Sequence, residues 1–248
     1  MSPITLVMAL AFCAVHFFVG HLRFLDRKPR SRWLSFAGGV AVGYVFLHLL
    51  PELATHSDTF ARATGFDDML SEASVYTLSL VGLVLFYGVE KFVQTSRKEQ
   101  RDAHGADRPL PGVFWIHIAA SAMLVAIVSY LLNEREAGAL GGLVLYFAAL
   151  LLHFVTADFG ARHADPALYD KAGRWVLVAA TLGGWTLGLL IELPPLLVGG
   201  LFAFVGGAIV LVVMKEELPE NRESAFWPFV GGAILYAGLV LSEHVLAG

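Results

Sequence analysis

The sequence predicts an all-α polytopic membrane protein with eight transmembrane helices. Of its 248 residues, 57% are hydrophobic and only 15% are charged, and the mean hydropathy is +0.68. A soluble domain is nearer half apolar and a quarter charged, so we expect the excess apolar surface to face lipid. Eight apolar runs are each long enough to cross the hydrocarbon core of a bilayer, which takes about 20 helical residues. Because backbone polar groups cannot stay unpaired in lipid, these runs are predicted to be helices.

The eight runs cover almost the whole chain. The first is too long for the core of a signal peptide and has no basic segment before it, so we interpret it as a span. The sixth and seventh runs are separated by residues 192–195 alone, where Pro194 and Pro195 favour a break in the helix. The predicted spans are Pro3–Leu25, Trp33–Leu53, Val75–Val93, Val113–Leu132, Ala139–Gly160, Gly173–Ile191, Pro195–Met214 and Phe226–Leu246.

The distribution of basic residues orients the chain in the membrane. Fifteen of the 17 lysines and arginines lie near or after the ends of the first, third, fifth and seventh runs, and only Arg62 and Arg135 lie on the other side. The positive-inside rule places the basic side in the cytoplasm. We therefore expect a multi-pass protein of the cell (inner) membrane with both termini extracytoplasmic. The net charge of −4 does not suggest a nucleic-acid partner.

Two polar connections between the runs are long enough for a structure to be predicted for each. The external segment Thr55–Ser74 is acidic and is predicted to be a solvated loop, with the alternative that it concentrates cations near an entrance. The cytoplasmic segment Ser96–Gly112 is charged, contains two prolines and is predicted to be a flexible linker. Glu90 and Lys91 lie near the end of the third run and are interpreted as an ion pair at the lipid headgroups.

A pattern shared by the second and seventh runs predicts an internal inverted repeat. Each run has a Gly-Gly pair, at residues 38–39 and 206–207, and a proline twelve residues after the second glycine, at Pro51 and Pro219. By the charge rule the two runs cross in opposite directions, as inverted-topology repeats do. The simpler interpretation is two glycine-rich helices that each stop at a proline. The repeat would arrange one transmembrane domain, residues 1–248, as 3+2+3 helices, with repeat one in 1–95, central helices four and five in 113–162 and repeat two in 173–248.

Residues 38–52 and 202–224 resemble the second and seventh helices of the ZIP (Zrt-, Irt-like) family of divalent metal-ion transporters. The first stretch reads GGVAVGYVFLHLLPE, and the second ends in KEELPENRES. The helix number, the external termini, the cytoplasmic loop after the third helix and the 3+2+3 repeat also fit that family. The resemblance implies a ZIP-like fold and transport of a divalent cation such as Zn²⁺.

The resemblance also points to a metal site on the fourth and fifth helices. The family's fourth helix carries His-Asn, then an acid three residues later and a glycine, and only His117 is kept here. Its fifth helix carries His-x-x-x-Glu or His-x-x-x-His, and only His153 is kept here, with Asp158 five residues on. The predicted metal ligands are therefore His117, His153 and Asp158, and the full binuclear site of the family is lost.

Both a metal site and a packing role are open for these residues. His117 and His153 lie at similar depths, and polar side chains inside a membrane are often functional, so the two imidazoles could bind Zn²⁺, which usually takes four ligands. Asp158 is about 140° around the helix from His153, so other groups would have to complete the shell. A neutral histidine can instead be satisfied by a hydroxyl or carbonyl of a neighbouring helix. The candidate accessory or pathway residues are Ser121, His163, His48, Glu52 and Glu192.

These observations favour a divalent metal-cation transporter of zinc-like specificity that works by alternating access. The alternative is a non-transporting ZIP-fold homologue with a structural, regulatory or assembly role, which the lost ligands favour. A membrane metalloenzyme is not expected, because no two histidines are three or four residues apart. The expected partners are the lipid bilayer and a divalent cation, Zn²⁺ or a similar ion, as substrate. No organic cofactor is expected, and a homodimer is left open.

Overall fold

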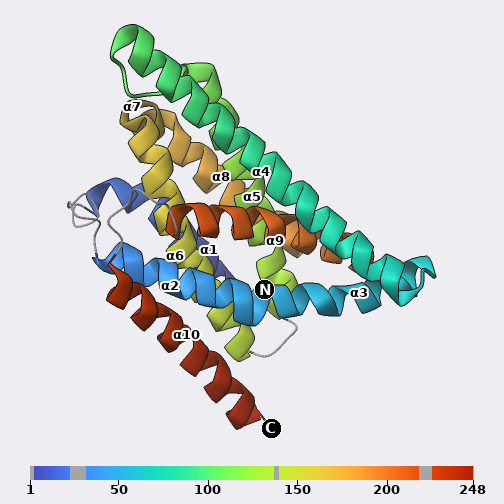
Figure 1. The fold of residues 1–248 in the computed structure, drawn as a ribbon. Coiled ribbons are helices and arrows are strands. Elements are labelled where there is room, and N and C mark those ends of the chain that lie inside the picture. The colour runs from blue at the N-terminus through green and yellow to red at the C-terminus, as the bar shows by residue number, and fades with distance from the viewer. Residues whose placement is uncertain (1–2, 23–31, 137–139, 218–224, 248) are drawn as a thin grey trace.

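The computed structural model describes residues 3–22, 32–136, 140–217 and 225–247, and every regular element within these ranges is a helix (Figure 1). Seven helices in the described residues are long and apolar enough to cross a membrane. The predicted class, an all-helical polytopic membrane protein, is therefore confirmed. The eighth predicted run is also helical, but its described apolar stretch, Phe226–Ser242, is shorter than the other seven. The eighth span therefore stays a prediction.

The helices follow the predicted runs, and several continue beyond them. Two of the long helices contain a π-helical turn, η3 in the second run and η4 at the start of the sixth. The predicted end of the first run and the predicted start of the fifth lie outside the described residues. The elements are α1 (Pro3–Phe18), η1 (Val19–His21), α2 (Arg32–Tyr44), η3 (Val45–Leu49), α3 (Leu50–Thr64), α4 (Asp68–His104), α5 (Pro111–Glu136), α6 (Leu140–Ala164), α7 (Pro166–Leu168), η4 (Tyr169–Gly173), α8 (Arg174–Leu190), α9 (Pro195–Glu217) and α10 (Phe226–Ala247).

The two polar connections are mostly helical, so their prediction as a loop and a linker was wrong. α3 continues through the acidic segment to Thr64, and α4 continues through the basic segment to His104. Asp67 caps the start of α4, where its side chain accepts a hydrogen bond from the Leu70 N–H (2.8 Å). Charged residues such as Glu, Lys and Arg lower the hydropathy but are good helix formers. A hydropathy run therefore ends before the helix does.

Glycines and prolines mark the helix ends. α3 ends at Gly65 and α4 at Gly105, and these residues have φ of 72° and 67°, a left-handed conformation that favours glycine. The predicted break between the sixth and seventh runs is confirmed, because α8 ends at Leu190 and α9 begins at Pro195. Proline suits the first turn of a helix, where its missing N–H leaves no hydrogen bond unmade.

α2 and α10 cross in close contact through one glycine from each helix. A Cβ at Gly39 of α2 would overlap the carbonyl oxygen of Phe229 on α10. Reciprocally, a Cβ at Gly232 of α10 would overlap the carbonyl oxygen of Phe36 on α2. Glycine is needed at both positions because only it lets the two backbones come this close.

α4 and α9 cross in the same way. A Cβ at Gly207 of α9 would overlap the carbonyl oxygen of Ser79 on α4, and a Cβ at Gly82 of α4 would overlap that of Phe204 on α9. In both crossings, each glycine lies against a carbonyl oxygen of the other helix, and that oxygen belongs to the residue three positions before the other helix's glycine. The two helix pairs therefore meet in the same register, although they come from different parts of the chain.

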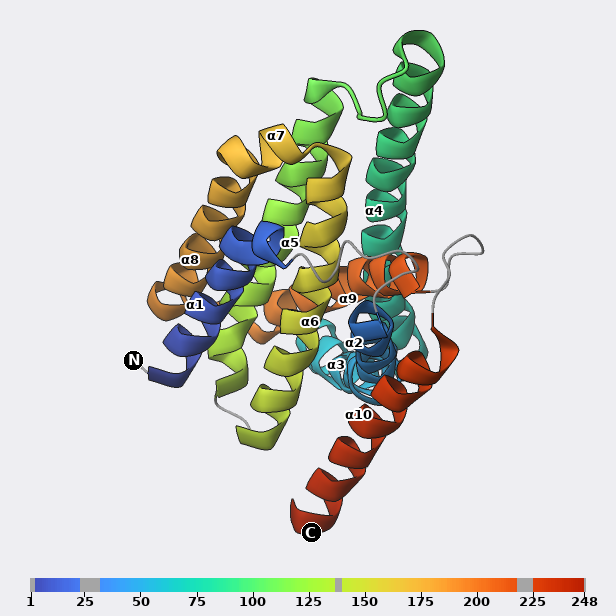
Figure 2. The same cartoon turned by 90° about the vertical axis from the view of Figure 1, so that its left-hand side faces the viewer.

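Two groups of helices meet along α5 and α6. α1, α5, α6 and α8 run side by side in Figure 2, and α8 contacts both α1 and α5. The second group contains α2, α3, α4, α9 and α10, built around the α2–α10 and α4–α9 crossings. α6 contacts α2, and α5 contacts both α4 and α9. Residues from both groups therefore face one another beside the two central helices.

Candidate cation site

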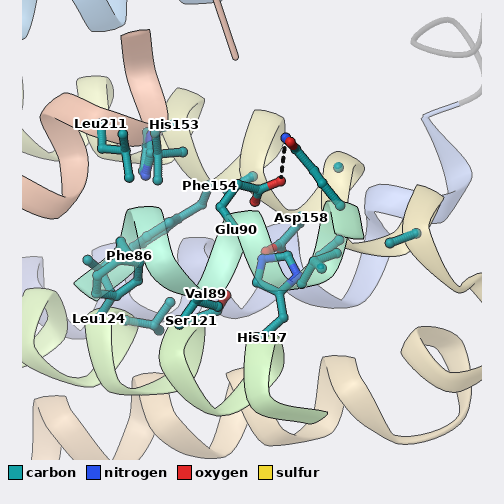
Figure 3. A pocket seen from close by; sticks show the side chains of 18 of the residues that line it. Phe86, Val89, Glu90, His117, Ser121, Leu124, His153, Phe154, Asp158 and Leu211 are labelled. Atoms are coloured by element: carbon teal, nitrogen blue, oxygen red, sulfur yellow. Dashed lines mark hydrogen bonds between the residues drawn. The ribbon is translucent and has the colours of Figure 1, made fainter. Parts of the chain in front are cut away.

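A cavity of about 180 Å³ lies between α4, α5, α6 and α9 (Figure 3). Much of its wall is apolar, with Phe86, Leu124 and Leu211 among the lining side chains. One water molecule occupies roughly 30 Å³ in the liquid, so the cavity has room for a partly hydrated ion. Its polar lining consists of Glu90, Gln94 and Arg97 of α4, His117 and Ser121 of α5, and His153 and Asp158 of α6.

Four residues singled out in the sequence line this one cavity. His117 and Ser121 are four residues apart on α5 and so lie on the same helix face. His153 and Asp158 are five residues apart on α6, and both are buried. The structure thus brings the histidines of the fourth and fifth runs to one place. Their role as metal ligands stays a prediction.

Asp158 is held by a histidine from a distant part of the chain. The distance between His16 Nδ1 and Asp158 Oδ2 is 2.6 Å, and both side chains are almost completely buried. Such a short contact is typical of a charge-assisted hydrogen bond. The Tyr169 hydroxyl donates a second hydrogen bond, to the carbonyl oxygen of His16 (3.1 Å). The pair therefore links α1 to α6 at the wall of the cavity.

His16 is a site residue that sequence reasoning did not assign. The available signal is a histidine inside an apolar run, which is costly in a membrane unless it is paired. Its partner lies 142 residues away on another helix, so sequence spacing could not identify it.

Glu90 belongs to the polar lining of the cavity, a role that the sequence did not predict. It lines the cavity, whereas the neighbouring Lys91 is exposed. Gln94, one turn further along α4, donates a hydrogen bond from Nε2 to Glu90 Oε1 (3.2 Å) (Figure 3). Adjacent residues on a helix point in different directions, which is why Glu90 and Lys91 face different surroundings. The headgroup position of Glu90 and Lys91 stays a prediction.

The polar side chains are unevenly distributed within the cavity. In Figure 3, Glu90, His117 and Asp158 gather toward one end, while His153 lies toward the other end beside Leu211. Among the residues that the structure describes, no three His, Cys, Asp or Glu side chains are grouped closely enough to hold a metal ion together. Hydroxyl groups, carbonyl groups and water can supply the other ligands of a divalent cation.

The charge of Arg97, which also lines the cavity, is balanced by a nearby acid. Arg97 Nη2 lies 3.0 Å from Asp107 Oδ2, in the short connection between α4 and α5. Because Asp107 partly neutralises this guanidinium, the carboxylate of Glu90 contributes much of the remaining local charge. The cavity is therefore better suited to a cation than to an anion.

The other predicted pathway residues lie outside this cavity. His48 and Glu52 are near each other at the junction of η3 and α3, with 3.9 Å between Nε2 and Oε2. His163 is exposed and stacks on Phe159 at 6.0 Å between ring centroids. Glu192 is exposed in the connection between α8 and α9. None of these four residues is part of the cavity lining.

Comparison with known proteins does not assign the chain to a family. No family model, curated protein or solved structure matches the chain. The resemblance to ZIP transporters therefore remains a prediction from the two sequence stretches, and the function has to be inferred from the site itself.

Proposed function

We propose that this chain is a divalent metal-cation transporter of the ZIP type, and that the ion passes through the cavity between α4, α5, α6 and α9. One observation carries the proposal. Residues that the sequence selected as candidate ligands or accessory groups, His117, Ser121, His153 and Asp158, all line a single cavity among apolar helices. Ionisable side chains are costly inside a membrane and often mark ion pathways.

The proposed architecture has eight spans in a 3+2+3 inverted repeat. The repeat would exchange the second helix with the seventh and the third with the eighth. These helices contain α2, α9, α4 and α10, so the α2–α10 crossing would correspond to the α9–α4 crossing. Gly39 would then be equivalent to Gly207, and Gly232 to Gly82. The shared register of these close contacts supports the repeat. The Pro219 end of the repeated pattern lies outside the described residues.

The proposed transport cycle begins from a state in which the cavity faces the cytoplasm. Gln94 and Arg97, which line it, come after the third apolar run, on the side that the positive-inside rule places in the cytoplasm. Toward the outside, α9 packs through Gly206 against Leu49 and Leu53, which are both fully buried. Alternating access would open this packed layer and close the cavity, as rocking of one repeat against the other allows.

A non-transporting role within the same fold is the second candidate. The observation that favours it is the pairing of Asp158 with His16, because this acid already has a strong partner. On this alternative the polar residues of the cavity would hold helices together or bind a protein partner. No enzymatic activity is proposed.

Flux into proteoliposomes separates the two candidates. We expect the wild-type protein to carry Zn²⁺ or Mn²⁺ into vesicles that contain a metal-sensitive dye, above the rate in protein-free vesicles. The double variant His117→Ala with His153→Ala should reduce this flux to background. His163→Ala is the matched control, because this histidine lies on α6 but outside the cavity, and its flux should equal that of wild type. A wild-type protein that carries none of these ions would favour the non-transporting role.

A further inference from the structure

We propose that the transported ion is held between α4 and α5, by the carboxylate of Glu90 and the imidazole of His117, with the Ser121 hydroxyl and water in its shell. This inference rests on the proposed transport function and names the residues that would carry it. It moves the principal acidic ligand from α6, where the sequence suggested it, to α4.

The surroundings of Asp158 make it a poor ligand in this state. Its Oδ2 is 2.6 Å from His16 Nδ1, and the side chain is almost fully buried. An ion that bound Asp158 through this oxygen would have to displace a short hydrogen bond between two buried groups. Breaking such a pair leaves an uncompensated buried group, which is strongly unfavourable. Asp158 therefore keeps its hydrogen bond to His16 and does not have to bind the ion.

Glu90 has the features that Asp158 lacks. It is half-buried, so an ion can reach it through the cavity, and it comes from a different helix than His117. Gln94 donates a hydrogen bond to its Oε1 and so fixes the direction of the carboxylate. Ligating carboxylates in metal sites are usually oriented by such an additional hydrogen bond.

His117 faces the same cavity from α5, with Ser121 one turn further along the same face. In Figure 3 the side chains of Glu90 and His117 lie at the same end of the cavity, whereas His153 lies apart. The direct contact between α4 and α5 allows one ion to bridge the two helices. The site thus joins α4, a helix of the first repeat, to the central helix α5. Relative motion of these two helices can therefore change the affinity for the ion.

The donor set indicates which ions would bind. One carboxylate, one imidazole and one hydroxyl suit Zn²⁺, a borderline ion that binds imidazole, and Mn²⁺, a harder ion that binds mainly through the oxygen ligands. Ca²⁺ prefers oxygen ligands alone, so an imidazole disfavours it. The single cysteine of the chain, Cys13, is not in the cavity lining, so the site has no soft thiolate ligand for Cu⁺.

Equilibrium binding of Mn²⁺, followed by electron paramagnetic resonance on the purified full-length protein, tests the site. Glu90→Gln keeps the shape of the side chain and removes its charge. It should weaken binding by about 100-fold or more, since loss of an outer hydrogen bond alone typically costs about 10- to 100-fold. Glu99→Gln is the matched control on α4, because Glu99 is exposed and outside the cavity, and it should bind as wild type does.

Three further variants keep the inference testable if Glu90→Gln does not fold. Gln94→Ala changes an exposed residue and should weaken Mn²⁺ binding by about tenfold through loss of its hydrogen bond to Glu90. Glu90→Asp keeps the charge and should keep part of the affinity. Asp158→Asn should weaken binding less than Glu90→Gln does.

The possible results are distinguishable. If Glu90→Gln and Gln94→Ala bind Mn²⁺ as wild type does while transport is intact, the site between α4 and α5 is wrong and only this inference fails. If Asp158→Asn abolishes binding and Glu90→Gln does not, the acidic ligand is on α6. If the wild-type protein neither binds nor transports Mn²⁺ or Zn²⁺, the proposed function itself fails.

Discussion

His16 and Asp158 form a buried pair that joins α1 to α6, with 2.6 Å between Nδ1 and Oδ2. Each group alone would be costly in an apolar interior, because neither could replace the hydrogen bonds that water provides. Together they share one hydrogen bond, and the Tyr169 hydroxyl adds another at the His16 carbonyl. The pair explains how a carboxyl group can be stable among apolar helices, two residues before the end of the chain's fifth predicted span.

Removing one member of this pair should destabilise the protein. His16→Ala leaves the Asp158 carboxyl buried without its partner, and loss of one partner of a buried pair typically costs about 3–5 kcal/mol. Replacing both, as His16→Leu with Asp158→Leu, should recover part of the lost stability because no polar group is left unpaired. Thermal unfolding in detergent would measure both variants. Equal unfolding temperatures for His16→Ala and wild type would show that the pair contributes little.

The sequence was sufficient for the fold class because hydropathy reports directly on the surrounding solvent. It was less reliable for helix ends. The acidic and basic segments after Leu53 and Val93 end the apolar runs, yet α3 and α4 continue through them. Where the chain passes from lipid into water, charged residues become tolerated, but the helix does not have to end there. Capping residues such as Asp67 and Gly105 were the better signals for the ends.

For the site, the family resemblance selected His117 and His153, and both line the cavity. It could not identify His16, because that contact depends on where α1 packs and not on local spacing. Glu90 was not assigned to the site because a charged pair at the end of an apolar run is usually a headgroup feature. Only the rotation of α4 shows that the carboxylate faces inward while Lys91 faces out.

The close helix crossings predict a pattern of glycine substitutions. Gly82→Ala and Gly232→Ala should each lower stability by about 1–3 kcal/mol, because an added methyl group would collide with a backbone carbonyl oxygen. Gly88→Ala on α4 and Gly238→Ala on α10 are matched controls, since a Cβ at either position meets no atom within 4 Å. Thermal unfolding of the four variants tests this. If the controls lose as much stability as Gly82→Ala, helix crossing is not the cause.

Tyr130 should stabilise the break between α8 and α9. Its hydroxyl donates to the Ile191 carbonyl (3.0 Å) and accepts from the Leu193 N–H (3.1 Å). The hydroxyl also lies 3.2 Å from Glu134 Oε1. Tyr130→Phe should therefore cost about 1–3 kcal/mol for the loss of these hydrogen bonds. Tyr87→Phe, at an exposed position on α4, is the control and should have little effect. If Tyr130→Phe is as stable as the wild-type protein, the two prolines are sufficient to maintain the break without these hydrogen bonds.

Single cysteines would test the predicted orientation in a Cys13→Ser background. Asp58→Cys on α3 and Lys98→Cys on α4 are at exposed positions on opposite sides of the proposed membrane. A membrane-impermeant maleimide added to intact cells should label Asp58→Cys, and it should label Lys98→Cys only after the cells are broken. The reverse pattern would invert the topology and make the cavity face outward.

The most direct test of the proposed ion pathway is anomalous X-ray scattering from crystals of the protein grown with Mn²⁺. We expect an anomalous peak inside the cavity, between the side chains of Glu90 and His117. A peak found only elsewhere, for instance beside His48 and Glu52, or no peak within the cavity at saturating Mn²⁺, would contradict it.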